Sequence, residues 1–212
     1  MKKSKAETAK TRKTILRAAS RAFRERGFNG VAVKELMGQA GLTHGGFYAH
    51  FPSKEALLVE ACADAFSDSI ERLMGVSAAA PAGEGLKAMI EAYLSPQHRD
   101  QPGFGCLIPS LGGEISRESP HVRQSFTQSV TKLLDLLGDQ LDLGDPQERE
   151  AAALSLLARM VGGMLLARAV DDPELSDRIL AACRESSGAE YREQSGPPQD
   201  FNVRTAPHES EV

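Results

Sequence analysis

The sequence predicts an all-α fold, with an N-terminal three-helix domain followed by a C-terminal helical domain. Apolar residues recur at helical spacing, as in Val33, Leu36, Met37 and Ala40. Three helix-start signals, each a capping side chain followed by a proline, stand at 119–120, 145–146 and 172–173. We expect the domains to span residues 8–52 and 53–186, and the Ser/Gly/Pro/Glu-rich residues 187–212 to form a disordered tail.

The composition is typical of a soluble cytoplasmic protein. Of 212 residues, 41% are hydrophobic and 25% are charged. The most apolar run, 160–170, is too short to span a bilayer and contains Arg168, so we expect no membrane association. Cys62, Cys106 and Cys183 are odd in number and far apart, which argues for a reducing compartment. None of these cysteines stands at a zinc-ligand spacing from another cysteine or from a histidine, so we expect neither a metal nor a cofactor.

Charge is divided unevenly along the chain. Residues 1–60 contain twelve Lys or Arg and five acidic residues, a net charge of +7. Because the whole chain carries −4, residues 61–212 carry −11. A basic N-terminal module on an acidic body is the distribution that attraction of phosphates at one end would require.

The first helix is expected over residues 8–26, because Ile15, Ala19 and Phe23 follow helical spacing and Gly27 can end it. Residues 1–7 form a lysine-rich arm without apolar periodicity, which we expect to be disordered without DNA. The basic face of this helix could approach phosphates, although such a charge run is more often a solvated face.

A pair of short helices follows. The first covers 33–40, and Gly41 can adopt the left-handed conformation that ends it. Thr43 is placed to cap the second helix, which buries Phe47 and Phe51 at i, i+4. The pattern fits a helix-turn-helix that inserts its second helix into a DNA major groove. Taken alone it fits an ordinary corner of an all-α protein equally well.

Residues 12–58 resemble the DNA-binding domain of the TetR/AcrR family of bacterial transcriptional regulators. The resemblance rests on Gly27-Phe28, on Tyr48-Ala49-His50-Phe51, and on Ser53-Lys54-Glu55 opening a long fourth helix. It covers about a quarter of the chain and implies no enzymatic activity. The DNA-binding residues implied are Lys34, with Thr43, Tyr48, His50 and Lys54 on the DNA backbone and His44, Gly45 and Gly46 facing the bases.

The chain departs from the family pattern around this motif. Val31-Ala32 stand where a capping Thr or Ser is usual, which costs roughly 1 kcal/mol. Gly45 and Gly46 each cost about 0.5–1 kcal/mol relative to Ala inside a helix. We therefore expect a recognition helix that is marginal alone and becomes firm on DNA.

The C-terminal domain is expected to begin at Ser53, which can cap the fourth helix. Glycines, alanines and prolines predict loops at 75–85 and 95–103. The expected helices cover 54–74, 84–94, a short distorted one at 105–114, then 120–141, 146–170 and 173–184.

The resemblance implies that the last two helices form a four-helix bundle with a second subunit, and that the dimer represses from a palindromic operator. It further implies a pocket for an unknown small-molecule effector. Apolar residues of helices four to eight would line it: Cys62, Phe66, Met89, Tyr93, Cys106, Leu107, Phe126 and Met160. Each of these could instead be plain core.

Cys106 follows Gly103-Phe104-Gly105 at the expected start of a short helix, where the dipole would favour thiolate. Similar family members look like sensors of oxidants or electrophiles. Cys106 could instead be a small buried packing residue.

Two other functional classes explain fewer features of the sequence. An all-α enzyme is disfavoured because His98, His121 and Ser125 have no evident third partner, and no phosphate loop is present. A non-specific DNA-coating protein is disfavoured by the charge of −11 on residues 61–212.

Overall fold

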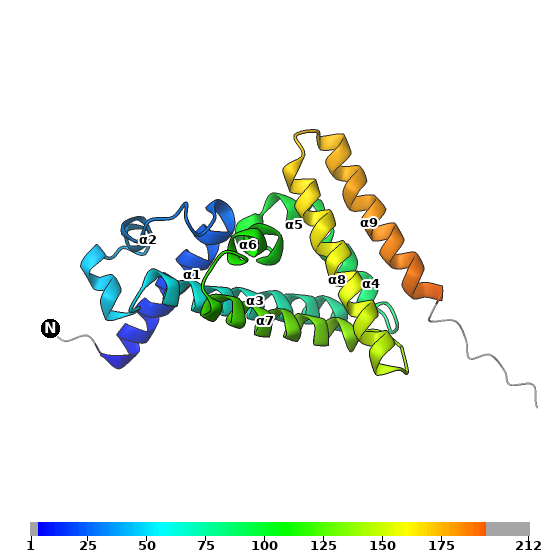
Figure 1. The fold of residues 1–212 in the computed structure, drawn as a ribbon, viewed down its shortest axis with the longest axis horizontal. Coiled ribbons are helices and arrows are strands. Elements are labelled where there is room, and N and C mark those ends of the chain that lie inside the picture. The colour runs from blue at the N-terminus through cyan, green and yellow to red at the C-terminus, as the bar shows by residue number, and fades with distance from the viewer. Residues whose placement is uncertain (1–3, 194–212) are drawn as a thin grey trace, which may run out of the picture.

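A computed structural model describes residues 4–193, which contain helices and no strand. The elements are α1 (Lys5–Arg26), α2 (Val33–Gln39), the 3₁₀ helix η1 (His44–Ala49), α3 (Lys54–Ala79), α4 (Gly85–Tyr93), α5 (Pro96–Asp100), η2 (Pro102–Phe104), α6 (Ile108–Ile115), α7 (Pro120–Gly138), α8 (Pro146–Ala169) and α9 (Pro173–Glu193). Helices α1, α2 and η1 form one end of the molecule, and α3 and α7 run along it toward the α8–α9 pair (Figure 1). The predicted all-α fold is confirmed.

Helix α1 begins earlier than expected. The Ser4 hydroxyl accepts from the Glu7 amide at 3.1 Å, and the Glu7 carboxylate accepts from the Ser4 amide at 2.7 Å. This reciprocal capping box satisfies two amides that would otherwise lack partners. The prediction of a disordered arm is therefore wrong for residues 4–7, and residues 1–3 lie outside the described part.

The helix-turn-helix follows the expected order with one difference. Gly41 has a φ of 69°, as a left-handed helix end requires. The Thr43 hydroxyl makes no capping bond, contrary to prediction, and η1 begins with a backbone bond from Gly46 N–H to the Thr43 carbonyl at 3.0 Å. This i→i+3 pattern is a 3₁₀ turn, which is consistent with the weak helix predicted for Gly45-Gly46.

The core of the N-terminal domain forms around two stacked phenylalanines. The ring centroids of Phe47 and Phe51 are 5.9 Å apart, and both side chains are fully buried in a core that also contains Ile15, Leu36 and Leu57. Burial of each large side chain contributes on the order of 2 kcal/mol. The core therefore holds η1 in place although its local helix propensity is poor.

Helix α3 starts as predicted, with the Ser53 hydroxyl accepting from the Ala56 amide at 3.0 Å. It continues to Ala79, beyond the predicted end at 74. Gly75 is tolerated within it, and the helix stops shortly before Pro81, whose ring disfavours helical geometry in the preceding residue. The predicted loop at 75–85 is thus helical in its first half.

The segment predicted as a loop at 95–103 contains α5 and η2. The Ser95 hydroxyl accepts from the His98 amide at 3.1 Å, and Pro96 occupies the first helical position. The next helix, α6, starts at Ile108 rather than at 105, with Pro109 in its first turn. Cys106 consequently precedes this helix.

Helices α8 and α9 pack closely because α8 has a glycine at the crossing. A Cβ at Gly163 would lie 2.6 Å from Cys183 Sγ on α9, whereas one at Gly162 would meet nothing within 4 Å. The capping carboxylates of Asp145 and Asp172 start the two helices as predicted. Helix α9 runs to Glu193, so a disordered tail from 187 is wrong up to that residue; 194–212 lie outside the described residues.

Among residues 4–193, helix α8 alone is long and apolar enough, by length and composition, to cross a membrane. Its most apolar window has a mean hydropathy of 1.5, and 39% of that window is buried inside the fold. Core helices of soluble proteins pass the same test. Residues 160–169 are thus the end of a longer apolar helix, and the prediction that this region is too short to span a bilayer is wrong by length alone.

Candidate nucleic-acid interface and ligand cavity

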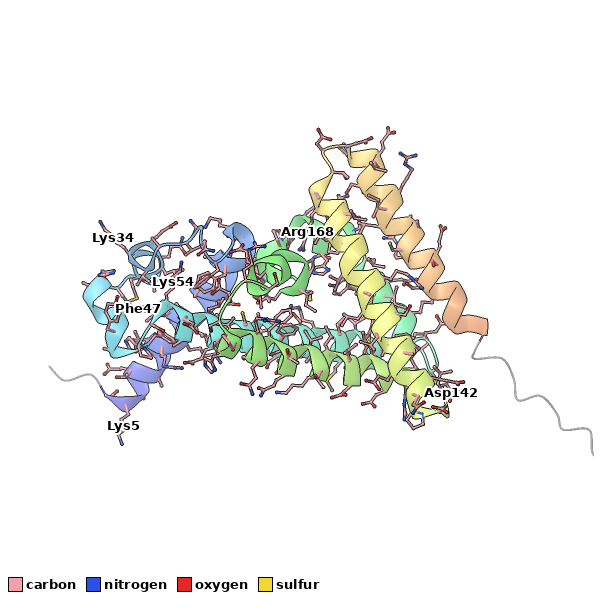
Figure 2. All side chains as sticks on the ribbon, viewed as in Figure 1. Lys5, Lys34, Phe47, Lys54, Asp142 and Arg168 are labelled. Atoms are coloured by element: carbon pink, nitrogen blue, oxygen red, sulfur yellow. The ribbon has the colours of Figure 1, made fainter. Side chains whose placement is uncertain are left out.

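The outer face of the helix-turn-helix presents polar groups of several kinds. Lys34, Thr43, His44 and Gly45 are exposed, and Tyr48 is 63% exposed. The Tyr48 ring stands edge-on to His44, with centroids 6.2 Å apart. A Cβ at Gly45 would meet nothing within 4 Å, so the backbone there is open to an approaching ligand. Lys34 lies at the same end of the molecule as Phe47 in Figure 2.

Lys54 has a different environment from the one predicted. Its ammonium donates to the Phe28 carbonyl at 2.6 Å and lies 4.3 Å from the Phe28 ring centroid. Desolvation lowers the pKa of Lys54, with Glu114 and Glu118 opposing that shift. The side chain therefore ties α3 to the turn after α1, a correction to its expected exposure, and a contact with phosphate stays a prediction.

His50 and Gly46 are half-buried rather than fully exposed at the surface. The His50 Nδ1 atom is buried without a hydrogen-bond partner. Gly46 lies in ordinary contact with Met37 and Thr43, at 3.7 Å from a Cβ position. Of the eight predicted DNA-binding residues, five are thus exposed and three are partly covered.

The basic face of α1 is mostly engaged within the protein. Arg12 pairs with Glu60 at 2.5 Å and lies over the Phe51 ring, and Arg21 pairs with Glu25 at 2.8 Å. Arg24 is buried. Arg17 is exposed and available at the surface. Contact between this whole face and phosphates is therefore not supported.

Residues of α1 and of the turn after it contact the C-terminal domain away from α3. Arg24 Nη1 donates to the Gly105 carbonyl at 2.9 Å, and its Nε donates to the Ser20 carbonyl at 3.1 Å. On α6, the Glu114 carboxylate accepts from the Phe28 amide at 2.9 Å. Desolvation lowers the pKa of Arg24, with Arg72 adding to the shift.

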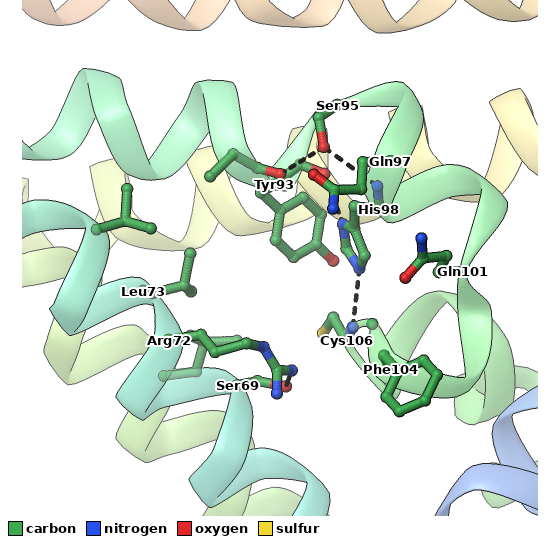
Figure 3. Close-up of a pocket in the computed structure, with 14 residues that line it drawn as sticks. Ser69, Arg72, Leu73, Tyr93, Ser95, Gln97, His98, Gln101, Phe104 and Cys106 are labelled. Atoms are coloured by element: carbon green, nitrogen blue, oxygen red, sulfur yellow. Dashed lines mark hydrogen bonds between the residues drawn. The ribbon is translucent and has the colours of Figure 1, made fainter.

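A cavity of about 270 Å³ lies next to the first of these contacts. Residues from α3, α4, α5, α7 and the 101–106 segment line it (Figure 3). Its lining residues are Ser69, Arg72, Leu73, Val76, Ala92, Tyr93, Ser95, Gln97, His98, Gln101, Phe104, Gly105, Cys106 and Leu133.

Only Tyr93 and Cys106 among the predicted pocket residues line this cavity. The remaining six pack in or against the hydrophobic core, which was the alternative role considered for them: Cys62, Phe66, Met89, Leu107, Phe126 and Met160. Helical spacing identifies buried faces, but it does not distinguish a packed face from one that borders a cavity.

His98 organises the wall of the cavity. Its Nδ1 lies 2.6 Å from the Tyr93 carbonyl, and its Nε2 accepts from the Cys106 amide at 2.8 Å. An imidazole that donates through Nδ1 and accepts through Nε2 is neutral. Desolvation lowers the pKa of His98 to about 4. The sequence had offered His98 only as a polar residue of a loop, and the proline-bracketed segment around it was the one available signal.

The chemistry of Cys106 differs from the prediction. The residue is buried, and desolvation raises the pKa of its thiol, although Tyr93, the Ile108 amide and two arginines act in the opposite direction. The expected stabilisation of thiolate at a helix start is outweighed because Cys106 precedes α6 and is enclosed. Burial likewise raises the pKa of Cys62 to about 12.

Comparison with known proteins identifies the N-terminal part. Residues 15–61 match the family described as bacterial regulatory proteins, tetR family. An uncharacterised HTH-type transcriptional regulator of Bacillus subtilis (strain 168), YerO, is 31% identical over 150 residues, which is 68% of this chain and 51% of YerO. The N-terminal domain belongs to the TetR family.

Other TetR-family relatives are similar over comparable stretches. The repressor DhaR of Mycobacterium sp. (strain GP1) is 31% identical over 112 residues, covering 53% of this chain and 56% of DhaR. The repressor NemR of Escherichia coli (strain K12) is 27% identical over 139 residues, covering 63% and 68%. This chain spans about half the length of YerO and DhaR.

Solved TetR-family structures share the fold over most of this chain. The reduced form of E. coli NemR has a TM-score of 0.72 at 23% identity and covers 85% of this chain and 96% of its own. A regulator from Chloroflexus aurantiacus J-10-FL has a TM-score of 0.75 at 22% identity, covering 89% and 98%. The two-domain helical architecture is therefore that of the family.

Proposed function

We propose that this protein is a cytoplasmic, homodimeric transcriptional repressor of the TetR family that binds a palindromic operator and is released by a small molecule. The observation that carries the proposal is the exposed face of Lys34, Thr43, His44 and Tyr48 on a buried helix-turn-helix core. These side chains offer ammonium, hydroxyl and imidazole donors suited to phosphate oxygens and base edges. The net charge of +7 on residues 1–60 supports the same surface.

Exposed leucines on α8 and α9 support a dimer. Leu154, Leu165 and Leu166 on α8 are 46–53% exposed, and Leu175 on α9 is 36% exposed. Association of two such faces would remove this apolar area from water. We expect Leu165→Arg to yield a monomer by light scattering on a size-exclusion column. Met74→Arg, at an exposed site on α3, serves as the control and should remain dimeric.

A dimer would read two half-sites about one helical turn, ~34–36 Å, apart. A small change in the separation of the two recognition elements would then lower operator affinity. The contacts of Arg24 with Gly105 and of Glu114 with Phe28 support a route from the cavity to the N-terminal domain, beside the continuous helix α3. An effector needs only different affinities for the two arrangements.

Competition binding tests the proposal. The protein is mixed with labelled DNA from immediately upstream of its own gene, and unlabelled random duplex is added. A repressor should prefer a palindromic site by ~10³ or more. Equal affinity for all duplexes would favour a DNA-coating protein, and no duplex binding at moderate salt would remove the repressor proposal and favour the enzyme alternative.

A thiol trigger is a second candidate for the release step. Cys106 lines the cavity, so a small electrophile that enters could reach its sulfur. The solved NemR structure is described as a reduced form, which concerns that protein. Against this candidate, burial raises the pKa of the Cys106 thiol and so lowers its thiolate fraction.

A further inference from the structure

The polar groups of the cavity include a cation without an anionic partner. Arg72 extends from α3 toward the segment that carries Cys106 and Phe104 (Figure 3). Its Nη2 donates to the Ser69 hydroxyl at 3.0 Å, and that hydroxyl in turn donates to the Ala65 carbonyl at 2.8 Å. Among the described residues Arg72 forms no ion pair, and no acidic side chain lines the cavity.

A second group in the cavity lacks a strong partner. Tyr93 is 4% exposed, and among the described residues its hydroxyl has no hydrogen bond of good geometry, only a weak interaction with the Cys106 thiol. The ring is held edge-on against His98, with centroids 4.6 Å apart, and the hydroxyl lies beside Cys106. A buried hydroxyl without a strong partner costs free energy, which a ligand with an acceptor group would recover.

The local field around these groups is positive. Arg24 and Arg168, like Arg72, act electrostatically on His98, which remains neutral. Arg168 is fixed by donating to the His98 carbonyl at 2.7 Å and to the Ser110 hydroxyl at 3.1 Å. The carboxylates of Asp64 and Asp68 on α3 interact electrostatically with Arg24. Arg72 is therefore the cation that remains for a ligand.

Apolar side chains also line the cavity, beside the polar Ser95, Gln97 and Gln101. Leu73, Val76, Ala92 and Leu133 line one part of the cavity, and Phe104 adds a ring. An apolar cavity of about 150 Å³ holds benzene. A volume of about 270 Å³ therefore accommodates one ring or a short alkyl chain together with one polar group.

We propose that the cavity binds a small monocarboxylate with an apolar body, whose carboxylate accepts hydrogen bonds from Arg72 and Tyr93 while the body packs on Leu73, Val76 and Leu133. A guanidinium donates two parallel bonds to a carboxylate, and a charge-assisted bond is stronger than a neutral one. Assigning this ligand as the effector rests on the proposed repressor function. The proposed binding site does not depend on that function.

Calorimetry on the full chain without DNA tests the site. The probes are benzoate, phenylacetate and 3-phenylpropionate, each compared with its neutral amide of nearly the same shape. We expect at least one carboxylate to bind, and its amide to bind at least ten-fold more weakly. Arg72→Gln should weaken binding of that carboxylate roughly 10- to 100-fold and leave the affinity for the amide nearly unchanged.

Two variants separate the ligand contact from a general effect on folding. Tyr93→Phe keeps the ring and removes only the hydroxyl, so we expect a several-fold loss of carboxylate affinity. Arg123→Gln makes the same charge change at an exposed position of α7 outside the cavity and should bind like the unmodified protein. The unfolding midpoints of all three variants are measured alongside.

Equal binding of acids and amides, unchanged affinity in Arg72→Gln, or no binding of any carboxylate at millimolar concentration would overturn the proposal. Because calorimetry needs no DNA, a failure here leaves the repressor proposal standing. Conversely, carboxylate binding by a protein that ignores duplex DNA would support the site and remove only its assignment as an effector pocket.

Discussion

The buried guanidinium of Arg24 in α1 donates to the carbonyl oxygen of Gly105 at 2.9 Å, one residue before Cys106 in the cavity wall. This bond joins the N-terminal domain to the lining of the cavity across 81 residues of sequence. Replacing Arg24 by Met would leave the Gly105 carbonyl without this donor. We expect the free energy of unfolding to fall by about 1–3 kcal/mol in urea titrations.

Arg17→Met is the matched control for that experiment. Arg17 lies on the same helix but is exposed, so its replacement should change stability by less than about 0.5 kcal/mol. Equal unfolding midpoints for the two variants would show that the Arg24 bond contributes nothing net, its hydrogen bond being offset by the cost of burying the charge.

Tyr48→Phe removes one hydroxyl from the exposed face of η1. Because a hydroxyl bonded to phosphate carries no sequence information, affinity should fall roughly two- to ten-fold for operator and random duplex alike. Fluorescence anisotropy with both DNAs measures the effect, and thermal unfolding should be unchanged because Tyr48 is 63% exposed. A loss confined to the operator would instead assign Tyr48 to base recognition.

His98 predicts a pH dependence of stability. Its pKa is lowered from 6.5 to about 4 in the folded state, so the unfolded chain binds the proton more tightly. The stability that depends on neutral His98 is fully present above pH 6.5 and is lost progressively as the pH falls toward 4. The total loss in the free energy of unfolding is about 3 kcal/mol at most. Urea titrations at pH 7.5, 6.0 and 5.0 should show this loss.

His98→Gln should flatten that dependence because glutamine does not titrate. A matched measurement on His121→Gln, where the histidine is exposed on α7, should retain the full slope. If the slope survived in His98→Gln, the acid sensitivity would have to arise elsewhere in the chain.

Alanine substitutions at two neighbouring glycines of α8 should have opposite effects on stability. In Gly163→Ala the new methyl group would lie 2.6 Å from Cys183 Sγ, and the resulting overpacking should cost about 1–3 kcal/mol. In Gly162→Ala the methyl group meets nothing within 4 Å, and stability should rise by roughly 0.5–1 kcal/mol. Thermal unfolding of the two variants decides whether the α8–α9 crossing is as close as described.

Alkylation distinguishes the two roles considered for Cys106. Cys183 is only partly buried, whereas Cys62 and Cys106 are buried and burial raises the pKa of both thiols. Iodoacetamide at pH 7.5 should therefore modify Cys183 first, as peptide mass spectrometry can follow. Faster modification of Cys106 would mean that its thiolate is accessible through the cavity and would restore the thiol trigger.

Local signals in the sequence located most helix starts. Ser53, Asp145 and Asp172 each cap the helix predicted for them, because a side-chain oxygen bonded to an amide two or three residues on needs no tertiary contact. The predicted helix ends were less accurate than the predicted starts. Helix α3 passes Gly75, since tertiary packing overrides the modest cost of one glycine.

The residues predicted to bind DNA lie near one another in sequence, and five of the eight are exposed, while their contact with DNA stays a prediction. Gly46, His50 and Lys54 are partly covered, Lys54 because its ammonium donates to the Phe28 carbonyl 26 residues away. The cavity was predicted poorly for the same reason. Periodicity placed Phe66 and Met160 on apolar faces, but they pack in the core, while Arg72 and His98 were not selected.

The sequence by itself determined the helical class, the order of the helices, the charge asymmetry and the residues of the turn between α2 and η1, since all of these depend on near neighbours along the chain. Only the tertiary structure decided which polar side chains line one cavity. Arg72, Tyr93 and His98 come from three helices, and their proximity depends on how those helices pack. Burial then sets the chemistry, because desolvation raises the pKa of the Cys106 thiol where its place in the sequence suggested the opposite.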